Sequence, residues 1–435
     1  MARKVFKGLF VLLLLLACNT EMTAQPVKVK LEQLGFEKID TISSQNKRYS
    51  EVYFFFLKQP VDPKKPDRGS FLQRIVLRHA GFDKPMVIVT EGYNADYAFY
   101  PFYEEEIAKN LDANLLVVEH RYFGESMPEI QNWKMLNLEN ATNDLHTIVT
   151  KLKTLYQSAW LATGISKGGQ TSLYYRYFYP EDVAATVAYV APLNFSEADP
   201  RVQYFLDTVG TATCRNKLLN LQFKLLNNRE LFRNQFKDST LKRGFTFERA
   251  GGIDHAFELN VLETGFAYWQ WYPYTCANFP DTTVSDDEIF NAWIAATGYD
   301  FFADQSLEDM QSFFYQALTE MGFYTYDTQP FGKLIHYDKK PDFKHGLPHG
   351  SKARYKKGLN KKVNRFLQKS GNQIIYVYGG HDAWSSTAVI PSVNTNALKI
   401  VKPSGSHTTR IRHFDEATQE KVYDTLREWL GIITN

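Results

Sequence analysis

The feature that most constrains this chain is an alternation of short apolar runs with helical patterns over its first 190 residues. The strand candidates are 86–90, 114–119, 160–163 and 183–190, and the helices between them are 102–111, 140–156 and 168–179. Strands that alternate with helices indicate a mostly parallel sheet wound by right-handed crossovers. Ahead of them, runs at 49–58 and 70–80 flank a polar turn and predict an antiparallel hairpin.

The alternation stops at Pro192 and resumes only near the C-terminus. The later strands and the last helix are expected at 373–378, 397–401 and 415–430. Residues 194–368 are helical in pattern and rich in aromatic residues. We therefore expect one sheet formed by residues 25–193 and 369–435. A helical cap, large enough to be a domain of its own, interrupts that sheet after the sixth predicted strand.

Residues 1–24 have the pattern of a secretion signal, a basic start followed by an apolar run. That run is too short to cross about 30 Å of hydrocarbon, which takes roughly 20 apolar residues, and no later segment predicts a transmembrane helix. Two processing routes stay open. Cleavage after Ala24 releases the protein to the periplasm or the medium, whereas the lipobox-like residues 15–18 place a lipid on Cys18 and make an outer-membrane lipoprotein.

The overall charge argues against a polyanionic partner. The chain has 50 Lys and Arg against 48 Asp and Glu. Loss of the leader removes three basic residues and one acidic residue, which leaves a neutral mature protein. A neutral protein has no general attraction to nucleic acid, so nucleic-acid binding is not expected.

Two cysteines remain in the mature chain, Cys214 and Cys276. An even pair in an oxidising compartment predicts a disulfide, and two buried free thiols are the other interpretation. The Cys and His residues show no zinc-like spacing, so we expect no metal and no cofactor. The sequence does not indicate the oligomeric state.

Residues 164–168 read Gly-Ile-Ser-Lys-Gly between a predicted strand and a predicted helix. This G-x-S-x-G pattern is typical of a nucleophilic serine on a tight turn, where small neighbours let the chain cross itself. We therefore predict Ser166 as the nucleophile. The backbone N–H of Lys167, at the helix start, supplies one oxyanion donor. The backbone N–H of Tyr93, in the loop after the third strand, supplies the second.

The acid and the histidine are expected to follow in that order. Asp382 lies in a glycine-rich loop directly after the strand 373–378, and His407 lies in the loop after the strand 397–401. Both positions are at strand ends, where a parallel sheet gathers its site. His381 precedes the acid, so Ser166, Asp382 and His407 form the predicted triad.

Three motifs carry a family resemblance: residues 119–126 (Glu-His-Arg-Tyr-Phe-Gly-Glu-Ser), 166–169 (Ser-Lys-Gly-Gly) and 405–410 (Gly-Ser-His-Thr-Thr-Arg). Together they resemble the secreted bacterial serine tripeptidyl aminopeptidases of the prolyl tri/tetrapeptidyl type, which are related to prolyl carboxypeptidase and its dipeptidyl-peptidase relative. Ala383 departs from the Asp-Pro-Trp that relatives usually carry there. The resemblance implies an α/β-hydrolase fold and an exopeptidase that releases tripeptides from free N-termini, with a preference for proline.

Such an enzyme needs an acidic group for the substrate ammonium, and the candidates are Glu91 and Glu263. A structural ion pair is an equally good interpretation of either. Trp269, Trp271 and Trp384 are candidates for a proline-binding pocket, although core packing explains them as well. Arg121 and Glu125 are expected to form a supporting ion pair. The rival functions are an esterase or lipase of the same fold, a prolyl dipeptidyl or carboxypeptidase, and a non-catalytic binding protein.

Overall fold

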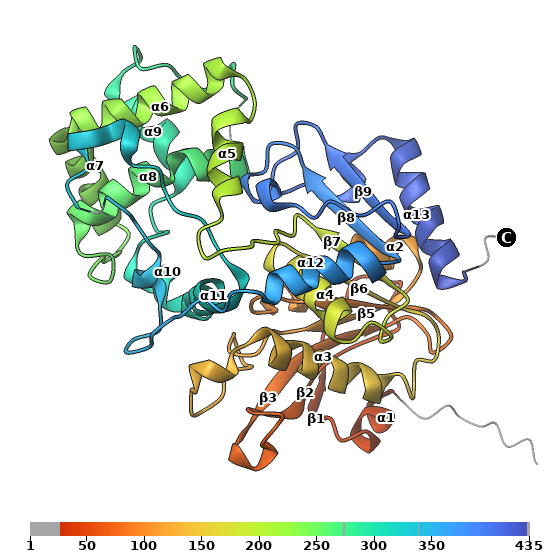
Figure 1. Cartoon of the computed structure of the whole chain (residues 1–435). Helices are drawn as coiled ribbons and strands as arrows, with labels where there is room; N and C mark the ends of the chain where they lie inside the picture. The colour runs from red at the N-terminus through yellow and green to blue at the C-terminus, as the bar shows by residue number, and fades with distance from the viewer. Residues whose placement is uncertain (1–26, 273–274, 338, 433–435) are drawn as a thin grey trace, which may run out of the picture.

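A computed structural model describes residues 27–272, 275–337 and 339–432 (Figure 1). The expected leader, with Ala24 and Cys18, lies outside them. The described residues form a nine-stranded sheet in the order β1-β2-β3-β5-β4-β6-β7-β8-β9. The strands are β1 (Glu37–Thr41), β2 (Glu51–Pro60), β3 (Ser70–His79), β4 (Met86–Thr90), β5 (Asn114–Val118), β6 (Trp160–Ile165), β7 (Ala185–Tyr189), β8 (Ile374–Gly379) and β9 (Ala397–Lys402).

The pairing of these strands is that of an α/β-hydrolase. β1, β2, β3 and β5 pair antiparallel in sequence, and β5, β4, β6, β7, β8 and β9 are parallel. The two halves of the chain meet where β7 pairs with β8, with Thr186 opposite Ile374. All six parallel strands therefore end at one edge of the sheet, which confirms the predicted fold class.

Helices cover both faces of the sheet because successive strand residues point to opposite sides. In β4, Val87 and Val89 pack into the core beneath α2 (Glu106–Asn110) and α13 (Glu416–Leu430). Met86 and Ile88 pack into the core on the other face. The helices there are α1 (Val27–Gln33), α3 (Leu138–Leu152), α4 (Lys167–Phe178) and α12 (Leu359–Ser370), and Figure 1 shows α3, α4 and α12 on the near side of the sheet.

The insertion between β7 and β8 forms a helical lobe beside the sheet (Figure 1). Its helices are α5 (Pro200–Thr208), α6 (Ala212–Asn227), α7 (Arg229–Leu241), α8 (Ile253–Trp271), α9 (Asp286–Thr297), α10 (Asp304–Asp309) and α11 (Gln311–Gln316). α8 is buried along most of its length and packs against α6, α7 and α9. No helix within the described ranges is both long and apolar enough to cross a membrane.

Three details differ from the prediction. α1 and β1 were not expected, so the insertion follows the seventh strand rather than the sixth. β1 pairs with β2 at the edge of the sheet and buries only Ile39, so its sequence lacks the apolar pattern that would predict a strand. The expected helix at 102–111 shrinks to the five residues of α2. α12 falls at the end of the predicted cap but packs on α4 of the core, where Tyr174 donates to Asn360 at 2.9 Å.

Candidate active site

Ser166 sits on a strained turn between β6 and α4. Its backbone has φ 56° and ψ −120°, a conformation that residues with a side chain rarely adopt. A Cβ on Gly164 would overlap the backbone of Gly168, and one on Gly168 would lie 2.8 Å from the carbonyl oxygen of Thr90. The glycines are therefore required because the chain crosses itself here and packs on the end of β4.

Asp382 and His407 meet at the ends of β8 and β9. His407 Nδ1 lies 2.9 Å from Asp382 Oδ2, and Asp382 is fully buried. The Asp382 carboxylate also accepts the Trp384 N–H at 3.1 Å and the Ser385 hydroxyl at 3.1 Å. These donors hold the carboxylate against the imidazole. The other ring nitrogen, Nε2, is then the one left for a proton from Ser166, which lines the same cavity as His407.

The cap contributes directly to the position of the histidine. The His407 backbone N–H donates to the carbonyl of Gln270 in α8 at 2.9 Å. The Trp271 ring meets the His407 ring edge to face, with centroids 5.8 Å apart. The last turn of α8 is therefore a fixed point of contact between the cap and the catalytic loop.

The loop after β4 lies against the start of α4, as the predicted oxyanion hole requires. The Tyr93 carbonyl accepts the His120 N–H at 3.1 Å, and the Tyr93 ring packs on Phe123 and Phe313. Within the described residues no acceptor bonds the Tyr93 N–H. Lys167 is the first residue of α4, so its backbone N–H has no partner inside the helix. The Lys167 N–H thus adjoins Ser166, and the Tyr93 N–H belongs to the loop that packs on Lys167 through Gly92.

A cavity of about 980 Å³ joins these residues to the cap. Ser166 and His407 line it from the core. The residues of α8 that line it are Glu263, Ala267, Gln270 and Trp271. Their spacing of four, three and one puts them on one face of the helix. The cavity therefore has a catalytic wall and a cap wall, and α8 forms much of the second.

Glu263 is the buried acid of the cap wall, with 4% of its surface exposed. Its Oε2 accepts the hydroxyl of Tyr324 at 2.9 Å and that of Tyr326 at 2.6 Å. Within the described part of the chain Oε1 has no hydrogen-bond partner. Burial raises the pKa of Glu263 to about 8, although both tyrosine hydroxyls act to lower it. No basic side chain among the described residues pairs with this carboxyl.

Glu91 belongs to the catalytic wall instead. The Tyr97 hydroxyl donates to its Oε1, and burial raises the pKa of Glu91 to about 7 while the nearby Lys167 lowers it. A Cβ on Gly168 would lie only 3.7 Å from the Glu91 Cα, so Glu91 stands beside the nucleophile turn. Both predicted acids line the cavity.

An aromatic box of Trp384, Tyr324 and Phe266 adjoins the same cavity, and the sequence identified only part of it. Trp384 and Tyr324 line the cavity, and Phe266 packs behind them against both rings. Phe266 stacks on Tyr324 with centroids 3.7 Å apart. The prediction for Trp269 is corrected, because Trp269 is only 2% exposed and does not line this cavity. Its ring packs directly on Gly210, where a Cβ would overlap it.

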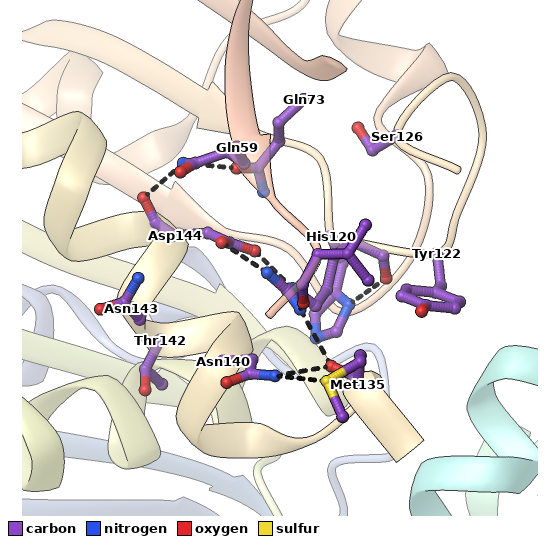
Figure 2. Close-up of polar contacts among 12 residues, drawn as sticks. Gln59, Gln73, His120, Tyr122, Ser126, Met135, Asn140, Thr142, Asn143 and Asp144 are labelled. Carbon is purple, nitrogen blue, oxygen red and sulfur yellow. Dashed lines mark hydrogen bonds and ion pairs between the residues drawn. The ribbon is translucent and has the colours of Figure 1, made fainter. Parts of the chain in front are cut away.

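Arg121 is buried and pairs with Asp144, whose surroundings are shown in Figure 2. Its guanidinium binds the buried carboxylate of Asp144, with Nε to Oδ2 at 2.6 Å, and also donates to the Met135 carbonyl at 2.9 Å. Glu125 is exposed and takes no part. The predicted Arg121–Glu125 pair is therefore wrong, because Arg121 turns inward to Asp144 of α3.

Cys214 and Cys276 are free thiols in this structure, so the predicted disulfide is absent. Cys214 is buried, with its Sγ 3.7 Å from the Tyr268 hydroxyl. Burial raises the pKa of the Cys214 thiol to about 11, and the neighbouring Cys276 acts in the same direction. Of the two interpretations that the sequence left open, this structure has the free thiols.

The sheet topology and the Ser166 turn define a hydrolase of the α/β-hydrolase class, and comparison with known proteins places it more closely. Residues 24–433 match the PS-10 peptidase S37 family, and the chain belongs to that family of serine peptidases. It is 30% identical to the prolyl tri/tetrapeptidyl aminopeptidase of Streptomyces mobaraensis, over 92% of this chain and 83% of that protein. It is 26% identical to the lysosomal Pro-X carboxypeptidase of Mus musculus, over 42% of this chain and 40% of that one. The family resemblance expected from the motifs is thereby confirmed.

Proposed function

We propose that this serine peptidase removes tripeptides from the free N-termini of peptides, and that it accepts proline near the cut. In this proposal Ser166 attacks the scissile carbonyl while His407 takes its proton and Asp382 orients the imidazole. The backbone N–H groups of Tyr93 and Lys167 stabilise the oxyanion. His407 then protonates the leaving amine, and water hydrolyses the acyl-enzyme.

The spacing along α8 is the observation that carries the tripeptide length. Gln270 marks where α8 contacts the His407 loop, and Glu263 lies seven residues earlier on the same helix face. At about 1.5 Å per residue these positions are roughly 10.5 Å apart along the helix. Three extended residues span at most about 10–11 Å. Glu263 is thus suitably placed to pair with the α-ammonium of a substrate whose third residue is at Ser166.

Glu91 fits the anchor role less well. It lies beside the nucleophile turn, closer than the N-terminus of a bound tripeptide would reach. Its carboxyl also has a cationic neighbour already, Lys167. We therefore assign the ammonium to Glu263 and give Glu91 a supporting place under the oxyanion loop.

The aromatic box favours a proline ring near the cut. Tyr324 and Trp384 line the cavity, with Tyr324 stacked on Phe266 and Trp384 edge to face against both. A pyrrolidine ring packs well on aromatic side chains of this kind. The relative from Streptomyces mobaraensis is named a prolyl peptidase, which agrees with this preference. An ester substrate carries no ammonium group, so an esterase of this fold would not need the buried carboxyl of Glu263 in its pocket.

We further propose that the protein is exported, because residues 1–24 have the pattern of a secretion signal. The two routes differ in product: cleavage after Ala24 leaves Gln25 first, whereas lipidation leaves a modified Cys18. The mass of the N-terminal peptide from the native host decides between them. An N-terminal peptide that begins at Met1 contradicts export by either route.

The function is tested with one peptide prepared in two forms, with a free and with an acetylated N-terminus. The wild-type enzyme is expected to release successive tripeptides from the free form only, and Ser166→Ala to release none. Cleavage of both forms indicates an endopeptidase or a carboxypeptidase, and turnover of aryl esters without any peptide cleavage indicates an esterase. Either result contradicts the proposal.

A further inference from the structure

The residue after the nucleophile carries a charge that the acyl-transfer steps do not use. Lys167 is 2% exposed, and its Nζ donates to the carbonyl oxygen of Gly92 at 2.5 Å. The same ammonium lies 4.9 Å from the centroid of the Phe123 ring and 5.5 Å from that of Tyr93. A buried lysine is costly unless its charge is compensated, so these contacts call for an explanation.

The Gly92 carbonyl belongs to the same peptide unit as the Tyr93 N–H. A peptide unit is planar and, in the trans form, its C=O and N–H point in opposite directions. When Lys167 holds the Gly92 carbonyl on its own side, the Tyr93 N–H must point away from the lysine. Glycine has the broadest backbone freedom of any residue, so Gly92 is the position at which this unit would otherwise rotate most easily.

A second contact joins the same two residues independently of the hydrogen bond. A Cβ on Gly92 would lie 2.6 Å from Lys167 Cγ and 2.7 Å from Lys167 Cβ. The stem of the lysine therefore lies flat against the Gly92 backbone, and only glycine leaves room for it. Packing and hydrogen bonding thus fix the same peptide unit from the same side.

We propose that the Lys167 side chain is a positioning residue of the oxyanion hole, which holds the Gly92–Tyr93 peptide so that the Tyr93 N–H faces the reacting carbonyl. This inference rests on the proposed peptidase function of Ser166. It gives Lys167 two separate tasks, since its backbone N–H is the other oxyanion donor. Glu91 supports the arrangement: burial lowers the pKa of Lys167 well below its usual value, and the Glu91 carboxylate raises it.

The test is Lys167→Met, which keeps the length of the side chain and removes the donor. The matched control is Lys399→Met, because the half-buried Lys399 also lies over a tyrosine ring, 5.1 Å from Tyr378, but outside the site. We expect kcat for a tripeptide amide to fall about 10²–10³-fold in Lys167→Met, the loss typical of one oxyanion donor, with KM changed less than about threefold. Lys399→Met is expected to match the wild type.

Binding of a tripeptide aldehyde distinguishes a positioning role of Lys167 in the oxyanion hole from a general effect on the folded structure. Ser166 Oγ adds to its carbonyl carbon, the hydroxyl proton passes to His407, and the carbonyl oxygen becomes the oxyanion. Lys167→Met is expected to bind this aldehyde about 10²-fold more weakly and the free tripeptide product equally well. Equal losses for aldehyde and product, or an unchanged kcat, overturn the proposal.

A second variant covers the case in which Lys167→Met fails to fold. Gly92→Ala keeps the lysine but displaces its stem, so it is expected to show the same selective loss of aldehyde binding. Normal aldehyde binding by a folded Gly92→Ala also overturns the proposal. If the wild type neither cleaves the amide nor binds the aldehyde, the proposed function fails, and this inference fails with it. If the wild type is active and Lys167→Met is equally active, the positioning role of Lys167 is excluded and the proposed peptidase function stands.

Discussion

The two walls of the cavity are built in different ways. Ser166 and His407 of the catalytic wall, and Asp382 behind His407, each follow the end of a parallel strand, in a short turn whose residue types are dictated locally. On the cap wall, Glu263 and Trp271 are placed by the packing of a long buried helix against the rest of the insertion. The catalytic groups are therefore positioned by backbone turns, whereas the proposed measurement of substrate length depends on long-range packing of the cap.

Loss of the nucleophile gives the largest expected effect and tests the catalytic wall alone. Ser166→Ala is expected to lower kcat for a tripeptide amide by about 10⁴-fold or more, since removal of a catalytic serine leaves only binding and the oxyanion hole. Binding of the tripeptide product should stay within about threefold of the wild type. A variant that retains a tenth of the activity contradicts the assignment of Ser166.

Neutralising the cap acid is expected to give the next largest effect and to leave the chemistry intact. Glu263→Gln removes the charge that pairs with the substrate ammonium, so kcat/KM for a free tripeptide amide should fall about 10²-fold. Turnover of a small aryl ester, which carries no ammonium, should change less than about threefold.

The matched control is Glu258→Gln on the same helix. Glu258 is equally buried but pairs with Arg229 at 2.8 Å, outside the cavity. It is expected to lower the melting temperature without a selective loss on the amide. Parallel losses on amide and ester in Glu263→Gln would show that the cap wall acts through structure rather than through the ammonium.

The pH dependence of binding sharpens the same assignment. Burial raises the pKa of Glu263 to about 8 in the free enzyme, and an α-amino group has a pKa of about 7.7–8.0. Below pH 7.5 the carboxyl must lose a proton to pair with the ammonium, and above pH 8.5 the amine must gain one. We therefore expect 1/KM for free tripeptide amides to be highest near pH 8 and to fall on both sides. Glu263→Gln should lose the acid limb, and an acid limb retained in that variant excludes Glu263 as its source.

The aromatic residues are expected to give the smallest effect. Trp384→Leu should lower the preference for a proline substrate over its alanine analogue about two- to tenfold, the range for loss of an aromatic contact. Trp269→Leu should leave that ratio unchanged and lower the melting temperature, because Trp269 packs inside the cap. An unchanged ratio in Trp384→Leu places the proline ring elsewhere.

These differences between the walls also explain what the sequence could predict. The strand-to-turn motifs around Ser166, Asp382 and His407 are short and local, so they could be recognised before their geometry was known. α8 is buried on nearly every side, so the periodicity of its apolar residues does not show which of Trp269 and Trp271 faces the cavity. These two residues point about 200° apart around the helix. The hydrogen bond from His407 to the Gln270 carbonyl joins backbones with no side-chain signature. β1 could not be predicted from the sequence, because it buries only one residue, Ile39, and so has no alternating apolar pattern.

The claim that the cap measures substrate from its N-terminus is tested most directly with a ladder of peptides. Each peptide shares one core sequence and is one residue longer at its free N-terminus than the previous one, and the first cut is located by mass spectrometry at early times. We expect the cut to move with the terminus and to stay three residues from it in every peptide that the pocket accepts. A cut that stays at one fixed bond of the core sequence, whatever residues precede it, would contradict the account.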